Sequence, residues 1–334
     1  MYYTYIIFIL IMLICFGTRP EYIKVKSLIH NLNNVKTCFT GQHKDLLKNI
    51  QVDYELNMDE IISENRLNNI ICNILKYTHI FLNVEKVLVQ GDTTTALAIA
   101  ISAFNYRLKV VHLEAGLRSI NLKDPYPEEA NRQLISRIAD IHLCPTEFNK
   151  ENLLKENVRG KIYVTGNTGL DNIVKEGCEY GNKVLLTMHR RDNHELIDKW
   201  FENIEKIANK YSDIEFLIPL HPNPQVQKHK DIFNKVKVVE PLTHEELIEY
   251  VKKCKFVISD SGGLQEECSF LNKKIIVCRK TTERPESVGI HSFMCLTPDD
   301  LEKLVDEIVV NYKVNAICPY GNGNSWKNIK DIIN

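Results

Sequence analysis

One stretch near the start of the chain combines charged side chains with a turn in a way that suits the binding of an anion. Gly17-Thr18-Arg19-Pro20-Glu21 follows an apolar run, and Pro20 is suited to the first turn of a helix on which Lys24 lies one turn further on. Arg19, Lys24 and the free N–H groups of a helix N-terminus would together bind an anion. A helix entry with two solvated cations is the alternative that this motif alone leaves open.

A second stretch has the features of a diphosphate site. The strand-like run Lys255–Ser259 leads into Asp260-Ser261-Gly262-Gly263 and then into a helical pattern. Adjacent glycines let backbone amides approach a diphosphate, and the serine adds a hydroxyl. Glu267 lies one turn along that helix and leans towards its N-terminus, within reach of a ribose, whereas Glu266 faces elsewhere. The alternative is a glycine turn with ordinary surface acids.

Four further titratable residues follow expected strands or open expected helices, and each has a structural alternative. Asp92 could cap a helix, Glu128 could be a first-turn acid, Glu114 could pair with Arg118, and His189 could be a buried, hydrogen-bonded imidazole. Taken together, the three carboxylates would converge on one edge of the first domain. Clustered carboxylates raise one another's pKa, as a proton donor at neutral pH requires. His189 would face them from the second domain.

Composition and missing motifs exclude several classes of function. Lys plus Arg number 42 and Asp plus Glu 43, for a net charge of −1, so nucleic acid and anionic membranes are not expected as partners. The ten cysteines form no C-x-x-C and lie mostly in apolar runs, which predicts buried thiols in a reducing compartment. Neither H-x-x-x-H nor HExxH occurs, so no metal is expected. Without G-x-G-x-x-G no dinucleotide cofactor is expected, and without a G-x-S-x-G elbow a hydrolase is not favoured.

The elements that must position these residues form two α/β series. The length of 334 residues favours two domains. We expect a first domain over residues 1–168, a second over 169–323, and a last helix over about 324–334 that can pack back on the first. Both should contain doubly wound parallel sheets, with ligands at the carboxyl ends of the strands. The predicted strands are 36–40, 86–90, 108–113, 140–144, 161–165, 183–188, 214–219, 236–239, 255–259 and 274–278, and the clearest predicted helices are 93–104 and 128–137.

The uncharged N-terminal run 1–16 is open to a second interpretation. It lacks the basic start and cleavage site of a signal peptide, and it is too short to span a bilayer before Gly17. We expect a buried parallel strand with a short N-terminal extension. A membrane-associated segment is the alternative.

Seven ordered motifs, spread from about residue 12 to about 324, resemble those of the non-hydrolysing UDP-N-acetylglucosamine 2-epimerases. They are Gly17-Thr18-Arg19-Pro20-Glu21, Gly91-Asp92-Thr93-Thr94-Thr95, His112-Leu113-Glu114-Ala115-Gly116-Leu117-Arg118, Pro127-Glu128-Glu129-Ala130-Asn131-Arg132, His189-Arg190-Arg191, Asp260-Ser261-Gly262-Gly263-Leu264-Gln265-Glu266-Glu267 and Thr281-Thr282-Glu283-Arg284-Pro285-Glu286.

The resemblance implies a GT-B-like fold of two Rossmann-like domains that face each other across a cleft. It implies inversion at C2 of a UDP-2-acetamido sugar, by loss of UDP to a glycal and its return. We also expect the protein to be a cytoplasmic homodimer. The default pair is UDP-N-acetylglucosamine and UDP-N-acetylmannosamine. A related deoxy or L-sugar, or a GT-B glycosyltransferase activity, is the alternative. The family's catalytic groups fall on Asp92, Glu114, Glu128 and His189, and its substrate-binding groups on Arg19, Lys24, His221, Ser261, Gly262, Gly263, Glu267 and Arg284.

The chain departs from the family's pattern in three places. Its N-terminal run is longer and more apolar than the family's usual start. The stretch between Asn167 and Lys183 is short, which should remove a helix near the domain seam. Bacterial members often bind a second nucleotide sugar as an activator. Here Gln42-His43-Lys44-Asp45 keeps part of that motif, and the expected Gly-Gln turn near 57–64 is missing. The resemblance therefore leaves activation by substrate open.

Overall fold

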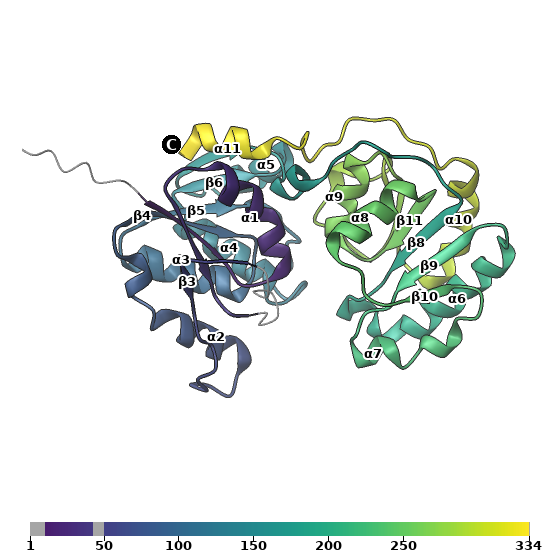
Figure 1. Cartoon of the computed structure of the whole chain (residues 1–334), viewed down its shortest axis with the longest axis horizontal. Helices are drawn as coiled ribbons and strands as arrows, with labels where there is room; N and C mark the ends of the chain where they lie inside the picture. Colours follow the sequence, from purple (N-terminus) through teal and green to yellow (C-terminus); the bar gives the residue numbers. More distant parts are fainter. Residues whose placement is uncertain (1–10, 43–49, 334) are drawn as a thin grey trace, which may run out of the picture. The chain divides into compact units, whose positions relative to one another are not determined.

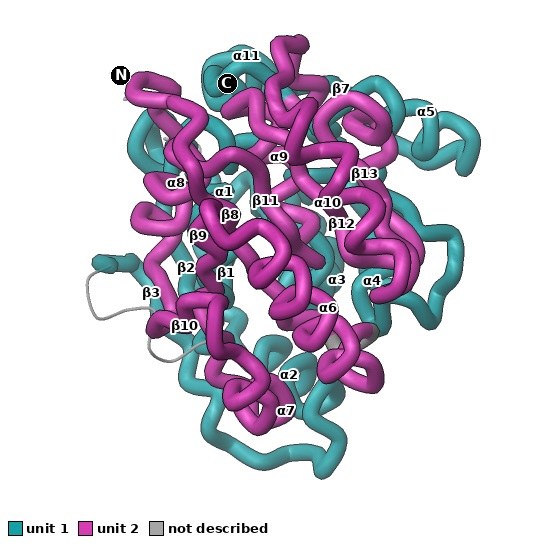
Figure 2. The backbone as a smooth tube through the Cα atoms, turned by 90° about the vertical axis from the view of Figure 1, so that its right-hand side faces the viewer, with its two compact units in different colours: residues 1–172, 321–334 teal, residues 173–320 magenta. Residues whose placement is uncertain are grey.

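The computed structural model describes residues 11–42 and 50–333. Contacts within the chain divide it into two compact units, shown in different colours in Figure 2. Unit 1 comprises Met1–Asn172 and Gly321–Asn334, and unit 2 comprises Ile173–Tyr320. From the sequence, we expect these boundaries after residues 168 and 323. The expected N-terminal extension before residue 11 and the motif residues His43, Lys44 and Asp45 lie outside the described residues.

Each unit is built on one parallel sheet. Unit 1 has the strand order β3-β2-β1-β4-β5-β6-β7 and unit 2 the order β10-β9-β8-β11-β12-β13. In both, the first strand lies in the middle and the chain winds outwards from it in two directions, which is the doubly wound arrangement of Rossmann-like folds. The strands are β1 (Ile11–Phe16), β2 (Val35–Phe39), β3 (Tyr54–Glu55), β4 (Val84–Gln90), β5 (Lys109–Leu113), β6 (Ile141–Cys144), β7 (Lys161–Val164), β8 (Lys183–Thr187), β9 (Glu215–Pro219), β10 (Lys237–Val239), β11 (Phe256–Ser259), β12 (Ile275–Cys278) and β13 (Ser292–Cys295).

The predicted strands are confirmed to within one or two residues, and the N-terminal run forms β1 where it is described. The prediction missed two strands, β3 and β13. β3 has only two residues, and β13 begins at a buried serine after His291, so neither shows the apolar run that marks a buried parallel strand.

Helices cover both faces of the two sheets (Figure 1). They are α1 (Arg19–Asn31), α2 (Arg66–Leu75), α3 (Thr94–Asn105), α4 (Glu128–Ile138), α5 (Glu147–Lys155), α6 (Ile197–Lys210), α7 (Pro224–Gln227), α8 (His244–Lys253), α9 (Gly262–Phe270), α10 (Leu301–Val310) and α11 (Ser325–Ile333). The two clearest predicted helices are α3 and α4, and the expected last helix is α11. The connection from β7 to β8, described throughout, contains the 3-10 turn η3 (Thr168–Asn172) and no α-helix, as expected.

Side-chain alternation in β1 explains how the core of unit 1 is divided. Leu13 and Cys15 pack with α2, α3 and α4, whereas Ile14 and Phe16 pack with α1 and α11. Both sets are buried, so the sequence of β1 is apolar throughout and does not alternate between apolar and polar residues. In unit 2, α6 and α10 pack on one face of the sheet.

The C-terminal helix α11 belongs to unit 1 although it follows unit 2 in the chain. It contacts α1 and η3, and Ile329 and Ile333 are buried in the unit 1 core. The carboxylate of Asp171 accepts hydrogen bonds from the backbone N–H groups of Ser325 and Trp326, each at 2.8 Å, which satisfies two N–H groups at the start of the helix. Among the helices of residues 11–42 and 50–333, none has the length and apolar character needed to cross a bilayer.

Candidate active site

The loops that follow β1 and β4 are joined by a buried carboxylate, that of Glu21. It accepts hydrogen bonds from the backbone N–H groups of Gly17 (2.8 Å) and Thr18 (2.7 Å) and from the hydroxyl of Thr93 (2.6 Å). Burial raises the pKa of Glu21, against the opposing effect of these donors. β2 and β4 lie on opposite sides of β1, so the order of the strands reverses between β1 and β4. Ligands bind at such a switch point in this fold, and the carboxylate of Glu21 lies there. This role of Glu21 was not predicted from the sequence, although its spacing from Thr18 is that of a capping box.

Asp92, in the loop after β4, is held by an arginine of α4. Nε and Nη2 of Arg132 lie 2.8 Å and 2.7 Å from Oδ2 of Asp92, and the side chain of Asn131 donates to the Asp92 carbonyl. Arg132 also donates to Glu129, a carboxylate of the first turn of α4 that is fully buried. The N-cap of α3 is Thr93, so the alternative that made Asp92 the cap is wrong. The adjacent threonine has the shorter side chain and already faces the N–H of the first turn.

Glu114 follows β5 in the left-handed backbone region, with φ at 64°. Its two carboxylate oxygens accept hydrogen bonds from Lys24 of α1 and from the side chain of Gln90, the last residue of β4. Arg118 instead forms a two-pronged ion pair with Glu156, with bonds of 2.6 Å and 2.9 Å, so the alternative that paired it with Glu114 is wrong. Lys24, expected to bind an anionic ligand, contacts a carboxylate of the protein itself.

Contacts within unit 1 bring Glu114 beside the loop that carries Asp92, and they tie the helix that begins with Glu128 to the same loop. A Cβ atom built on Gly91 would lie 3.6 Å from Oε2 of Glu114, so this carboxylate lies beside the loop that carries Asp92. Glu128 is the half-buried first residue of α4, the helix that Arg132 ties to the same loop. Glu128 is thus a first-turn acid of α4, as the structural alternative had it, and this position does not exclude a part in proton transfer.

A buried histidine of β5 donates a hydrogen bond to the loop that carries Asp92. Nε2 of His112 lies 2.8 Å from the carbonyl oxygen of Gly91, so this nitrogen carries the proton that it donates. Burial lowers the pKa of His112 to about 3. The imidazole is therefore neutral at physiological pH and acts as a fixed hydrogen-bond donor.

In unit 2, the ends of β8 and β11 are joined by a second buried carboxylate, that of Asp260. It accepts hydrogen bonds from the backbone N–H groups of His189 (3.0 Å) and Arg190 (2.9 Å) and from the side chain of Asn193 (3.1 Å). Nδ1 of His189 lies 3.4 Å from Oδ1 of Asp260, and 41% of the His189 side chain is exposed. The alternative that made His189 a buried imidazole is therefore wrong. From the sequence, Asp260 was interpreted only as part of a turn, and its bonds to the residues that follow β8 were not predicted.

His221 stacks on His189, with ring centroids 5.5 Å apart and ring planes 16° from parallel. Burial lowers the pKa of His221, and the neighbouring His189 lowers it further. At neutral pH, His221 is an uncharged ring beside the exposed His189 and can donate or accept a hydrogen bond.

The N-terminus of α9 is open on one side and lined by an arginine on the other. Ser261 is the N-cap, and a Cβ atom on Gly263 would meet only the Ser261 hydroxyl, at 3.9 Å. A Cβ atom on Gly262 would lie 2.6 Å from Nη1 of Arg284, so a larger residue there would have to displace the guanidinium. N–H groups at the start of a helix, beside a guanidinium, form an arrangement that binds phosphate.

Arg284 is buried and lies between two carboxylates. Its Nε donates to Glu266 and its Nη1 donates to Glu283, each at 2.5 Å. Glu266 therefore faces Arg284. This agrees with the expectation that Glu266 does not point towards the ribose. Glu267 bonds to His244, and Arg19 is exposed at the start of α1.

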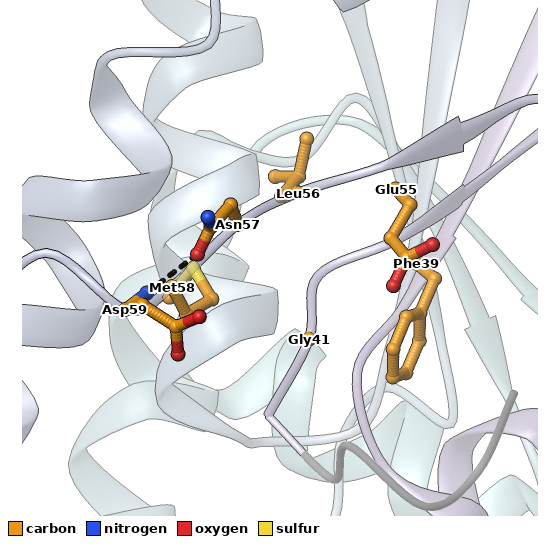
Figure 3. Close-up of a pocket in the computed structure, with 7 residues that line it drawn as sticks. All are labelled: Phe39, Gly41, Glu55, Leu56, Asn57, Met58 and Asp59. Carbon is orange, nitrogen blue, oxygen red and sulfur yellow. Dashed lines mark hydrogen bonds between the residues drawn. The ribbon is translucent and has the colours of Figure 1, made fainter.

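Unit 1 also contains a pocket of about 380 Å³ near the ends of β2 and β3 (Figure 3). Its walls come from Phe39, Gly41 and the stretch 55–59, and the side chain of Asn57 accepts a hydrogen bond from the backbone of Asp59 within it. None of the candidate site residues lines this pocket. Within the described part of the chain, no group of three or more His, Cys, Asp or Glu side chains is arranged to hold a metal ion.

Two doubly wound units, each with charged side chains gathered at the ends of its central strands, define a GT-B-like α/β protein. The family model described as UDP-N-acetylglucosamine 2-epimerase matches residues 28–334. A UDP-N-acetylglucosamine 2-epimerase of Salmonella borreze is 37% identical and covers 96% of this chain and 97% of its own length.

Two solved structures extend the comparison. The UDP-GlcNAc 2-epimerase of Neisseria meningitidis bound to UDP-GlcNAc has a TM-score of 0.86 and 35% identity, covering 96% of this chain and 99% of that one. The enzyme of Methanocaldococcus jannaschii in complex with UDP-GlcNAc and UDP has a TM-score of 0.81 and 30% identity, covering 96% and 99%. The chain belongs to the UDP-N-acetylglucosamine 2-epimerase family.

Proposed function

We propose that this protein interconverts UDP-N-acetylglucosamine and UDP-N-acetylmannosamine by inverting the configuration at C2. The proposal is supported by family membership and by the two relatives whose solved structures contain UDP-GlcNAc. The observation that carries it is the gathering of carboxylates at the ends of β4 and β5, because inversion at a C–H centre requires removal and return of a proton.

In unit 1, we assign proton transfer to Asp92, Glu114 and Glu128. Arg132 orients Asp92, and Lys24 with Gln90 orients Glu114. Both carboxylates are thereby held in fixed positions, as groups that transfer protons must be. Lys24 thus has a second role besides the anion binding expected of it together with Arg19.

In unit 2, we assign the UDP-binding groups. The N–H groups of Gly262 and Gly263, the Ser261 hydroxyl and Arg284 would hold the diphosphate, and Glu267 the ribose. We assign His189 to the reacting end of the substrate, since its ring is exposed and anchored through Asp260, and His221 to substrate contact beside it.

The mechanism that we propose is elimination followed by re-addition. The C2 hydrogen of an acetamido sugar has no neighbouring ring carbonyl, so its removal alone would leave a carbanion without an electron sink. Breaking the C1–O bond supplies the sink: the C2–H electron pair becomes the C1–C2 double bond, the proton goes to a carboxylate, and UDP leaves with the C1–O electron pair. The reverse step forms the C1–O bond again while a carboxyl group delivers a proton to the opposite face of C2. Donors around the diphosphate stabilise the leaving group.

Two isotope experiments test this proposal. In deuterated water without any acceptor, proton NMR should show exchange of the C2 hydrogen, which a glycosyltransferase would not catalyse. Substrate labelled with oxygen-18 in the C1–O–P bridge should show the label scrambled into non-bridging phosphate oxygens, because released UDP can rotate before it re-adds. Epimerisation with the label wholly retained in the bridge and no leaked UDP would contradict elimination.

We also propose that the protein acts as a homodimer in the cytoplasm. Its ten cysteines are all free, in keeping with a reducing compartment. Apolar side chains are exposed on three helices of unit 1, of which α3 contacts the other two: Leu75 on α2, Phe104 on α3 and Leu134 on α4. Light scattering should give twice the mass of the chain, and Phe104→Asp should shift it towards the mass of one chain.

A further inference from the structure

The proposed ribose carboxylate, Glu267, is bonded to a histidine from another helix. Nε2 of His244, the first residue of α8, lies 2.7 Å from Oε1 of Glu267 on α9. Both side chains are largely buried, with 17% and 15% of their surfaces exposed. A carboxylate only accepts hydrogen bonds, so Nε2 of His244 carries the proton. The bond joins a neutral or charged donor to an anion and belongs to the strong, charge-assisted class.

This contact leaves one oxygen of the carboxylate for a ligand. Among the described residues, Oε2 of Glu267 has no hydrogen-bond partner, while Oε1 is occupied by His244. A glutamate side chain has three rotatable bonds, so an unheld Glu267 would sample several positions and lose conformational freedom on binding. A fixed carboxylate loses less, and the ligand is bound more tightly for that reason.

We propose that His244 is a positioning residue that holds Glu267 so that Oε2 faces the ribose hydroxyls of the nucleoside diphosphate. The inference rests on the proposed function, since it assumes that Glu267 binds ribose. We further propose that the preference for a ribose over a sugar without these hydroxyls depends on His244, although His244 does not itself touch the nucleotide.

The start of α8 does not depend on the histidine side chain. Thr243 is the N-cap, its hydroxyl accepts from the N–H of Glu246, and Glu246 accepts from the N–H of Thr243 at 2.8 Å. This capping box fixes where the helix begins. Substitutions at position 244 therefore leave the helix start in place, and effects on nucleotide binding can be separated from effects on folding.

The test compares two ligands in three variants of the full chain by calorimetry. UDP has both ribose hydroxyls, and the 2′,3′-dideoxy analogue of UDP has neither. We expect wild type to prefer UDP by roughly 10- to 100-fold, the scale of a hydrogen bond to a charged group. His244→Leu removes the donor at similar size and should reduce this preference to about threefold or less, with affinity for the analogue unchanged. His244→Gln keeps an N–H donor at the position of Nε2 and should restore most of the preference.

His229→Leu is the matched control, since it makes the same change at a half-buried histidine of unit 2 that takes no part in the pair. It should leave both affinities as in wild type. If His244→Leu keeps the full preference for UDP, or weakens both ligands equally, the proposal is wrong. If His244→Leu does not fold, a His244→Gln variant without the preference is equally decisive against it. Wild type that binds no UDP would contradict the proposed function, and with it this inference.

Discussion

Arg132 offers the sharpest test of how the acids of unit 1 are held. Its guanidinium contacts two carboxylates at once: Asp92, through Nε and Nη2, and the fully buried Glu129, through Nη1. We predict that Arg132→Met lowers both stability and turnover, and that Arg132→Lys lowers turnover more than stability. An ammonium is a single point charge and cannot reproduce the two-sided geometry of a guanidinium.

The size of each effect follows from burial. Removing the cation leaves Glu129, whose side chain has no exposed surface, with an uncompensated charge, and breaking such a pair costs about 3–5 kcal/mol. The lysine variant keeps the charge near Glu129, so we expect a loss of about 1–2 kcal/mol. In both variants Asp92 loses its two-point attachment, and a displacement of about 1 Å in a reacting group lowers turnover by roughly 100-fold.

Stability is measured by urea unfolding followed by circular dichroism, and turnover by proton NMR of the two epimers. Arg118→Lys is the matched control, because Arg118 is a buried arginine of the same unit that pairs with Glu156. It should lose stability without a large loss of turnover. If Arg132→Lys retains wild-type turnover, Asp92 needs no orientation by Arg132 and the reasoning is refuted.

Three further predictions concern unit 1. Replacing any one of its three candidate acids by the matching amide should lower turnover by about 100-fold while UDP affinity, measured by calorimetry, is kept; near-normal turnover in all three variants would contradict the assignment. Gly116→Ala should destabilise the protein by more than about 1 kcal/mol in urea, because φ is +87° and the new Cβ atom would lie 2.2 Å from the backbone oxygen of Asn149. His112, with a pKa lowered from 6.5 to about 3, contributes stability that is present above pH 6.5 and lost as pH falls towards 3, so wild type should lose roughly 2 kcal/mol between pH 7 and pH 5. His112→Gln should lose correspondingly less, and an equal loss in both proteins would show that His112 is not responsible.

Most of the fold could be predicted because the strands are buried on both faces. A short, wholly apolar run such as Val87-Leu88-Val89 is typical of a strand that is buried on both faces, and these three residues lie in β4. The edge strand β3 was missed because two residues at an edge need no such run. Sequence pattern thus identifies central strands, where burial dictates composition, better than edge strands, where it does not.

The sequence proposes the candidate site residues but does not predict the contacts among them. Lys24 and Glu114 are 90 positions apart, and no local rule says that they pair. Asp92 and Thr93 are both good capping residues, so the sequence could not tell which one faces the first turn of α3. Glu21 is different, since the spacing of its capping box was visible in the sequence and only its bond to Thr93 was not.

The return of the chain to unit 1 has a consequence for how the protein is made. Residues 325–333 are synthesised after the whole of unit 2, yet they supply Ile329 and Ile333 to the core of unit 1. Domains tend to fold as they emerge from the ribosome, and unit 2 is continuous in sequence, so it can complete its core while unit 1 still lacks its last helix. During that interval the apolar surface that α11 covers on α1 is open to solvent. The nascent chain is therefore most exposed to aggregation and to chaperone binding at the half that is synthesised first.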